Sequence, residues 1–343
     1  MRLRARTVVL GLLGAVALLL IVVISMVGWQ VVLGPKARPV TSRTIERTPA
    51  RVTRGEYLVE SVASCFHCHT EHDLSTPELA RVEAKKGAGW EMPIPELGKV
   101  IAPNITPDPE TGIGNWTDDE ILRAMQEGVS RDGHALFPVM PYLAFAKLDD
   151  EDAASIVAYL RTIPPVKNVL PKTQLIFPLS LIVKTIPAPK PASAAAPVRS
   201  TSEARGEYLA TVVANCQECH TPTKDGQVLP DMEYAGGTTF KDPSQGMKTV
   251  FSQNITPDPS GLSHYDEAMF IQVMHSGRVP GRVLNHIMPF EAFKTMSEAD
   301  LKDIWAYLKV QKPVKHRITN TDAPKPCPLC NHEHGLGDLN VKK

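Results

Sequence analysis

The sequence predicts a mainly α-helical chain in which one helical unit occurs twice, behind a single N-terminal transmembrane helix. Three observations support this: a long uncharged stretch near the N-terminus, short strings that recur at a nearly constant spacing, and helical patterns separated by proline- and glycine-rich loops. The chain has 343 residues, enough for two domains. Hydrophobic residues make up 43% and charged residues 22%, which excludes a disordered or collagen-like chain.

Basic and acidic residues are equal in number but unevenly distributed. Lys and Arg total 37, as do Asp and Glu, so a nucleic-acid binder is not expected. Residues 1–50 contain seven bases and one acid, whereas residues 51–165 contain ten bases and nineteen acids. We therefore expect the acidic first unit to dock a basic partner and the basic N-terminal segment to suit a membrane surface.

The N-terminal segment predicts a membrane anchor. No charge interrupts the stretch from Val8 to Trp29, which as a helix would be about 33 Å long, enough to cross a bilayer. The alternative is a cleaved signal peptide, but such apolar regions are usually about 7–15 residues long and end in small residues. Arg2, Arg4 and Arg6 precede the stretch and favour a cytoplasmic N-terminus. The sequence thus predicts a single-pass protein of the bacterial inner membrane, with the rest of the chain in the periplasm.

A tandem duplication follows this segment. Strings in the first half recur 148–151 residues later: Arg54-Gly55-Glu56-Tyr57-Leu58 as 205–209, Asn104-Ile105-Thr106-Pro107-Asp108-Pro109 as 254–259, and Met140-Pro141 as 288–289. Chance repetition in the same order is negligible. The predicted organisation is an anchor at 1–34, a first domain at 50–166, a linker at 167–204, a second domain at 205–315 and a tail at 316–343.

Each unit reads as helices joined by long loops. In the first unit we expect helices near Gly55–Ala63, from Thr117 and from near Asp149. The second begins with a Thr-Asp-Asp-Glu capping box, a strong helix-start signal. Long loops in a compact unit are uncommon unless they wrap something, and a large apolar cofactor would account for them.

The cysteines identify that cofactor. Two of the three Cys-x-x-Cys pairs are followed directly by histidine: Cys65-Phe66-His67-Cys68-His69 and Cys216-Gln217-Glu218-Cys219-His220. This is the attachment signal of heme c: two thiols about one helical turn apart form thioethers to the heme vinyl groups, and the next imidazole ligates the iron. A disulfide or a thioredoxin-like pair would suit one isolated Cys-x-x-Cys better than two duplicated copies. We therefore predict two covalently bound hemes, with His69 and His220 as proximal iron ligands.

Repeat symmetry selects the second axial ligand. Met140 and Met288 occupy matched positions, each in a Met-Pro pair before the last helix of its unit. Met125 and Met274 also match, but they fall at core-facing positions of a predicted helix, so packing is expected for them. We predict Met140 and Met288 as axial iron ligands, and His67, between the first two cysteines, as directed outward.

The tail carries the third cysteine pair. Cys327 and Cys330 are followed by Asn331 where heme attachment requires histidine, so a third heme is disfavoured. Two interpretations stay open. Paired thiols in an oxidising compartment predict a disulfide, whereas His332 and His334 could join the two thiolates in holding a metal ion.

With these motifs the chain resembles diheme cytochromes c of the class I fold, and more specifically the cytochrome c subunits of membrane-bound alcohol and gluconate dehydrogenases. The residues that carry the resemblance are Asn-Ile-Thr-Pro-Asp at 104–108 and 254–258, Met140-Pro141-Tyr142, Ala158-Tyr159-Leu160 and Phe177-Pro178-Leu179-Ser180. The resemblance implies two tandem class I cytochrome c domains with long loops around covalent hemes. Those subunits usually carry three heme units, whereas this chain has two and a short tail.

The function expected is one-electron transfer in a respiratory chain. His/Met ligation at both irons leaves no open position for a substrate and favours electron transfer. The expected partners are the membrane, a quinol-oxidising complex or dehydrogenase as donor, and an oxidase or soluble cytochrome as acceptor. The alternatives are a diheme peroxidase-like enzyme, which needs one exchangeable iron site, and a heme subunit of a larger complex, with the apolar segment Leu175–Val183 as an interface.

Overall fold

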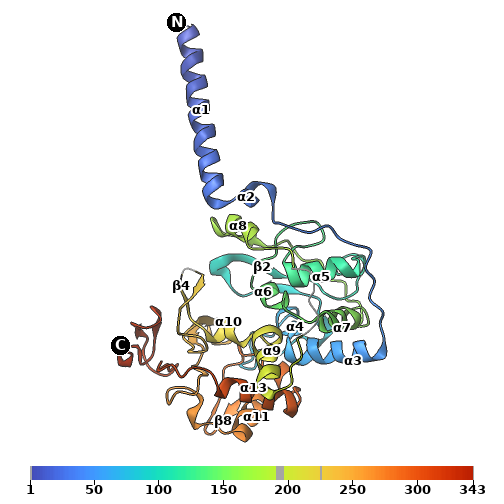
Figure 1. Ribbon diagram of the computed structural model, residues 1–343, viewed down its shortest axis with the longest axis vertical. Coiled ribbons are helices and arrows are strands. Elements are labelled where there is room, and N and C mark those ends of the chain that lie inside the picture. The colour runs from blue at the N-terminus through green and yellow to red at the C-terminus, as the bar shows by residue number, and fades with distance from the viewer. Residues whose placement is uncertain (1, 191–196, 225, 343) are drawn as a thin grey trace.

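The computed structural model describes residues 2–190, 197–224 and 226–342; residues 191–196 of the predicted linker lie outside the described part. A long N-terminal helix stands away from a body that is built from two units (Figure 1). The first unit comprises residues 49–175, the second unit residues 201–315, and the tail residues 316–342.

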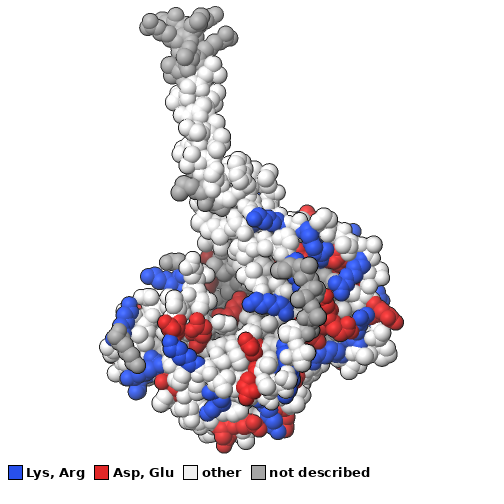
Figure 2. All heavy atoms as spheres, in the orientation of Figure 1, with Lys and Arg blue, Asp and Glu red and all other residues white. Residues whose placement is uncertain are grey.

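The N-terminal helix α1 (Arg2–Val27) leads into a short helix, α2 (Gln30–Leu33). Its described apolar side chains are exposed, for example Leu10 at 68% and Leu19 at 63%. The described part of this helix carries no charged side chain, whereas charges of both signs cover the visible face of the body (Figure 2). Among residues with described side chains, no helix is both long and apolar enough to cross a membrane. The predicted anchor stays a prediction.

Helices follow in the same order in the two units. Those of the first unit are α3 (Pro49–Tyr57), the π-helical turn η1 (Leu58–Val62), α4 (Cys65–Cys68), α5 (Asp118–Glu127), α6 (Tyr142–Phe145) and α7 (Asp150–Leu160). Those of the second unit are α9 (Ser202–Tyr208), the π-helical turn η5 (Leu209–Val213), α10 (Cys216–His220), α11 (Glu267–Ser276), α12 (Phe290–Phe293) and α13 (Glu298–Lys309). The recurring strings thus fold into recurring elements.

The expected helix starts are confirmed in two of three cases. Thr117 and Glu120 form the capping box that opens α5, and α7 has Asp149 as its N-cap residue. The first helix begins earlier than predicted, at Pro49, because the Thr48 side chain accepts the Arg51 backbone N–H and proline suits a first helical turn.

A glycine in each unit permits a close helix crossing. Helix α3 packs on α7, and α9 packs on α13. A Cβ on Gly55 would lie 1.9 Å from the Ser155 carbonyl oxygen, and a Cβ on Gly206 would lie 1.9 Å from that of Asp303. Only glycine fits at these two crossings, which explains why the recurring Arg-Gly-Glu-Tyr-Leu string contains it.

Short antiparallel strands hold the loops. In the first unit β1 (Trp90–Met92) pairs with β2 (Gly98–Ala102), which also pairs with β3 (Gln174–Leu175). The second unit has the pairs β4 (Thr223–Lys224) with β5 (Gln227–Val228), β6 (Thr239–Asp242) with β7 (Lys248–Phe251), and β8 (Arg278–Val279) with β9 (Arg282–Val283). In the tail, β10 (Lys325–Pro326) pairs with β11 (Glu333–His334). Single 3₁₀ turns are η2 (Glu83–Lys85), η3 (Pro95–Leu97), η4 (Val183–Thr185), η6 (Pro243–Gln245), η7 (Leu262–His264) and η8 (Gly337–Leu339).

The two units share one apolar core and meet through reciprocal contacts. Tyr57 of the first unit donates to Asp300 Oδ2 at 2.6 Å, near the start of α13. Tyr208 of the second unit donates to Asp152 Oδ2 at 2.8 Å, near the start of α7. Likewise η1 contacts α12 and η5 contacts α6. The interface therefore has the self-complementary pattern of a two-fold contact, here within one chain.

The segment between α2 and α3 fastens the N-terminal helix to the first unit. Arg38 pairs with Asp119 at 2.7 Å and with Glu127 at 2.6 Å, both on α5. Hydrogen bonding to Asp119 raises the pKa of Arg38. Near the same end of α1 lies α8 (Leu179–Ile182) with η4, where Lys184 Nζ donates to the Val31 carbonyl at 3.2 Å.

Candidate functional site

The first Cys-x-x-Cys-His string forms α4, a single helical turn. Ser64 adopts a left-handed conformation (φ 46°), which turns the chain sharply after η1 and starts the new helix. Cys65 and Cys68 are both half-buried free thiols. Burial raises the pKa of the Cys65 thiol to about 12, and the nearby Cys68 raises it further.

His69 presents one ring nitrogen for a ligand. Its Nδ1 lies 2.7 Å from the Pro103 carbonyl oxygen, which can only accept, so Nδ1 carries the ring proton. Burial lowers the pKa of His69, which favours the neutral imidazole. Nε2 therefore holds a free lone pair, the arrangement that a metal-ligating histidine needs.

The second string repeats this geometry on α10. Asn215 takes the left-handed conformation (φ 49°) in place of Ser64. His220 Nδ1 lies 2.7 Å from the Gln253 carbonyl oxygen, and burial lowers its pKa. Cys216 is half-buried and Cys219 is exposed. Both units thus offer two thiols one turn apart and a neutral imidazole beside them.

The Asn-Ile-Thr-Pro strings fix the loops that hold these imidazoles. Asn104 Oδ1 accepts the Thr106 backbone N–H at 2.9 Å, and its Nδ2 donates to the Val166 carbonyl at 2.7 Å. In the second unit Asn254 makes the equivalent bonds, at 2.9 Å to the backbone N–H two residues on and at 2.8 Å to Val314. Because each asparagine directly follows the residue whose carbonyl orients a histidine, the string helps to position the predicted proximal ligand.

The predicted axial methionines lie on matched backbone turns. Met140 accepts the Tyr142 backbone N–H at 2.8 Å, and Met288 accepts the Phe290 N–H at 2.7 Å. Both side chains are half-buried and pack against the core cluster that also borders Cys65 and Cys216. Met125 and Met274 are buried in that core, each 6% exposed, which confirms the packing role expected for them.

The two attachment strings lie near the interface between the units, since η1 and η5, which lead directly into them, are in contact. Burial raises the pKa of Cys68 to about 11, and Glu218 of the second unit raises it further. Burial likewise raises the pKa of Cys219 to about 12, with contributions from Glu218, Cys216 and Cys68.

His67 departs from its expected outward direction. It is half-buried, and burial lowers its pKa to about 3, with neighbouring His72 and Arg81 lowering it further. The backbone of Ile287, the residue before Met288, raises the pKa of His67, and His286 lowers it. The first attachment string therefore contacts the methionine segment of the second unit, a contact that depends on how the units pack.

The tail brings three of its four predicted metal-binding residues together. Cys327, Cys330 and His334 gather with His316, and the ligand atoms of all four lie within 4.8 Å of one another. His332 lies outside this group, because it belongs to the turn between the cysteines and β11, where its carbonyl accepts the Cys327 N–H at 2.9 Å. Sequence reasoning missed His316, although its position matches Asn168 of the first unit at an offset of 148.

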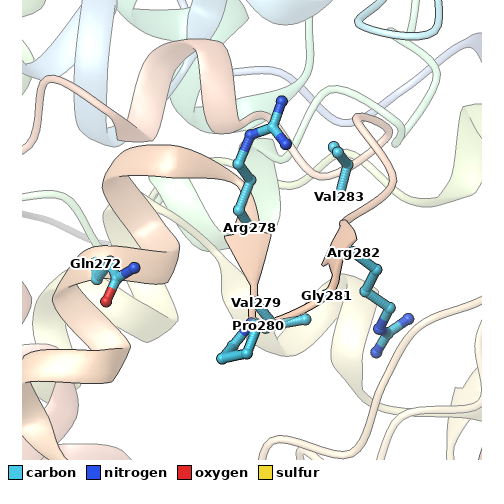
Figure 3. Close-up of a pocket in the computed structure, with 7 residues that line it drawn as sticks. All are labelled: Gln272, Arg278, Val279, Pro280, Gly281, Arg282 and Val283. Atoms are coloured by element: carbon cyan, nitrogen blue, oxygen red, sulfur yellow. The ribbon is translucent and has the colours of Figure 1, made fainter.

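A separate hollow of about 600 Å³ opens between α11 and the β8–β9 hairpin. It is lined by Gln272, Arg278, Val279, Pro280, Gly281, Arg282 and Val283. Arg278 and Arg282 extend from the hairpin in different directions (Figure 3). None of the predicted heme residues is among these lining residues, so the hollow is distinct from the attachment strings.

Together the residues fit heme c in both units. Each unit supplies free thiols at the required spacing, a neutral imidazole with an oriented ring and a half-buried methionine against the same core. Residues 52–164 match the family model described as Cytochrome c.

Curated relatives support the same family. The chain is 29% identical over 272 residues to the cytochrome c subunit of alcohol dehydrogenase (quinone) from Gluconobacter oxydans, a match that covers 76% of this chain and 54% of that subunit. It is 30% identical over 290 residues to the fructose dehydrogenase cytochrome subunit of Gluconobacter japonicus, covering 79% and 55% of the two chains. It is 31% identical over 225 residues to a diheme cytochrome c-type protein of Cereibacter sphaeroides, covering 64% and 72%. The chain thus spans only 54–58% of the length of the alcohol dehydrogenase subunits that it matches.

Proposed function

The chain belongs to the cytochrome c family, and from this premise we propose that it is a membrane-anchored diheme cytochrome c that relays single electrons from a dehydrogenase or quinol-oxidising complex. The observation that carries the proposal is the duplication of the whole ligand arrangement, with His69 and His220 each oriented through Nδ1 by a backbone carbonyl at 2.7 Å. Both units would then be class I cytochrome c domains.

Heme c, when bound, supplies reversible one-electron oxidation and reduction at its iron. The chain's own residues hold it: Cys65 and Cys68 in the first unit, Cys216 and Cys219 in the second, through thioethers. Matched Met140 and Met288 would complete His/Met ligation at both irons, which favours electron transfer at a raised potential over peroxide chemistry. A peroxidase would need one exchangeable site, so the match supports a carrier.

The contact between the units supports electron transfer between the two groups. The turns η1 and η5, which lead directly into the two attachment strings, contact each other. The reciprocal tyrosine bonds and the shared core hold the units in one orientation. A fixed arrangement keeps the distance between the redox groups constant, which a relay requires.

The partner is proposed from the relatives. Several are named as cytochrome subunits of alcohol, fructose or gluconate dehydrogenases. We therefore place a dehydrogenase first among electron donors and propose that this chain acts as a heme subunit beside it, passing electrons toward an oxidase or soluble cytochrome. The acidic first unit, with ten bases and nineteen acids in residues 51–165, would dock a basic partner surface.

Membrane attachment is part of the proposal. The stretch from Val8 to Trp29 contains no charge, and α1 stands clear of the body. Beside its end, Phe177 is 78% exposed and Ile176 is 49% exposed, an apolar surface suited to lie at the bilayer interface. The units would then lie on the periplasmic side of a bacterial inner membrane.

Two measurements test this function. Pyridine hemochrome analysis of the detergent-purified chain should give two hemes per polypeptide that survive acid-acetone extraction, and salt washing should leave the chain in the membrane fraction. One heme, or extractable heme, would contradict the diheme proposal. A mature N-terminus near residue 35 would replace the anchor with a cleaved signal and leave the heme assignment standing.

A further inference from the structure

A buried cluster of four ligating side chains lies where the tail meets the second unit. His316 is 0% exposed, Cys327 2%, Cys330 0% and His334 0%. Their ligand atoms all lie within 4.8 Å of one another. The cluster is remote in sequence from both heme attachment strings, and nothing in the proposed electron-transfer function uses it.

The hydrogen bonds of the two imidazoles define their tautomers. His316 Nδ1 lies 2.9 Å from the Ala235 carbonyl oxygen, and His334 Nδ1 lies 2.8 Å from the Gly335 carbonyl oxygen. Because a carbonyl oxygen only accepts, each Nδ1 carries the ring proton, and each neutral ring keeps its lone pair on Nε2. This is the arrangement in which metal-binding histidines donate their second nitrogen to a backbone carbonyl.

These two lone pairs point at each other. His316 Nε2 and His334 Nε2 are 3.0 Å apart in a site closed to solvent. Two unprotonated nitrogens at that distance repel, and the contact becomes favourable when a proton on one ring or a metal ion lies between them. The thiols beside them are the soft ligands that a thiophilic cation prefers.

The distances match a tetrahedral ion. With metal–nitrogen bonds of about 2.0–2.1 Å and metal–sulfur bonds of about 2.3 Å, tetrahedral angles give edges of about 3.3 Å between nitrogens and about 3.6 Å between nitrogen and sulfur. The observed edges are 3.0 Å between His316 and His334, and 3.4 Å between Cys327 Sγ and His316 Nε2. A tetrahedral set of two thiolates and two imidazoles is typical of structural zinc.

Residues around the cluster of four ligating side chains also favour metal binding there. Gly237 (φ 96°) lets a loop of the second unit approach closely, since a Cβ there would lie 2.9 Å from His316 Cε1 and 3.5 Å from Cys330 Sγ. Asn340 Nδ2 donates to Cys327 Sγ at 3.5 Å, a bond that stabilises a thiolate. Apart from the cysteines, the apolar cluster at this junction has Met232 and Ala235 as its buried members among the described residues, with Leu229, Val314 and Leu329 partly buried against it, so its core is small.

We propose that His316, Cys327, Cys330 and His334 bind one zinc ion as a closed structural site that fastens the tail to the second unit. Four protein ligands leave no position for water or substrate, so the ion is structural and not catalytic. Zinc has no redox change in proteins, so the site adds no third electron carrier. The proposal does not depend on the hemes.

The first test is metal content. The full-length chain, extracted in detergent and purified without chelator, is analysed by inductively coupled plasma mass spectrometry, with iron as the internal count of heme. We expect one zinc for every two irons, and zinc-edge X-ray absorption should give two sulfur ligands at about 2.3 Å and two nitrogen ligands at about 2.0–2.1 Å. Substoichiometric zinc with free thiols, or a tail peptide two hydrogens lighter because of a disulfide, would overturn the site.

Variants test the ligand set. His316→Asn and Cys330→Ser should each lower zinc per chain at least tenfold while heme per chain stays at the wild-type value. His332→Ala is the matched control, because that residue lies in the same turn outside the cluster, and it should keep its zinc. If His332→Ala loses zinc while His316→Asn keeps it, the ligand assignment is wrong. Because the absorption measurement uses unmodified protein, a variant that fails to fold does not remove the test.

Discussion

Asn168 in the first unit and His316 in the second occupy matching positions in the two repeats, each two residues after a valine whose carbonyl is held by the Asn-Ile-Thr-Pro asparagine. Asn168 Nδ2 donates to the Ala88 carbonyl at 3.0 Å and to the Gly89 carbonyl at 3.1 Å. His316 donates through Nδ1 to the Ala235 carbonyl at 2.9 Å. The two side chains therefore support equivalent loops.

The two side chains differ in whether a ligating atom remains free once the bond to the loop has formed. The Asn168 amide nitrogen donates to both loop carbonyls. The chain after it continues into β3, which pairs with β2. The His316 imidazole uses Nδ1 for the bond to Ala235, and its Nε2 lies next to Cys327 and His334. A histidine in place of asparagine at this position thus turns a hydrogen-bonded loop support into the metal ligand that we propose.

The largest expected loss of stability follows from replacing the glycine at the helix crossing that both units share. Gly55→Ala should disrupt the first unit and Gly206→Ala the second, since each Cβ would lie 1.9 Å from a carbonyl oxygen. Overpacking of this kind costs about 3 kcal/mol or more of unfolding free energy. Heme yield per chain and thermal unfolding of the purified protein measure the loss. Glu56→Ala and Glu207→Ala, at exposed neighbouring positions, should behave like wild type.

Met140 and Met288, the predicted axial ligands, allow ligation to be compared between the two units. Met140→Ala should open the first iron, and Met288→Ala the second, so that half of the heme binds carbon monoxide in each variant. Loss of the sulfur ligand should also lower the potential of that heme and abolish its share of the ferric absorption band in the near infrared. Met125→Ala, in the buried core, should destabilise the protein without making heme reactive. Carbon monoxide binding by wild-type protein would contradict symmetric ligation.

Substitutions at the matched positions Asn168 and His316 should have effects of intermediate size on stability. Asn168→Ala removes donors from two carbonyls and should cost about 1–3 kcal/mol of unfolding free energy in the first unit. His316→Asn keeps an amide in reach of the Ala235 carbonyl, so the second unit should unfold at nearly the wild-type urea concentration while its tail becomes protease-sensitive. Limited proteolysis with mass spectrometry distinguishes release of the tail from unfolding of the whole unit. Equal tail protection in His316→Asn and wild type would mean that the tail does not need the ion.

Local features could be predicted from the sequence because they depend on neighbouring residues. The Thr117 capping box is confirmed, and so is the helix start after Asp149. Each of the two Cys-x-x-Cys-His strings forms one helical turn, with the oriented imidazole next to it, because the spacing within the string fixes that geometry.

Features that join distant segments could not be predicted in the same way. His316 lies eleven positions before Cys327, outside any metal-binding spacing, and its role arises only when the tail folds back. His67 is half-buried between His72 of its own unit and residues 286–287 of the second unit, an environment that depends on how the units pack. One sequence signal points to His316: the string Val-Lys-Asn at 166–168 recurs as Val-Lys-His at 314–316, with histidine in place of asparagine.

The smallest expected effect is the difference between variants of the reciprocal tyrosines Tyr57 and Tyr208, which are alike in sequence but differ in burial. Tyr208 is 7% exposed and donates to Asp152 at 2.8 Å, whereas Tyr57 is half-buried and donates to Asp300 at 2.6 Å. A hydrogen bond to a charged acceptor contributes about 1.5–3 kcal/mol when buried and less where water can replace the donor. Tyr208→Phe should therefore lower the urea midpoint of the chain more than Tyr57→Phe does. Flash-induced electron transfer between the two hemes should slow in the same order, since both bonds hold the units together. If the two variants have equal effects, burial does not distinguish the two halves of the interface, and the contact is as symmetric in energy as it is in sequence.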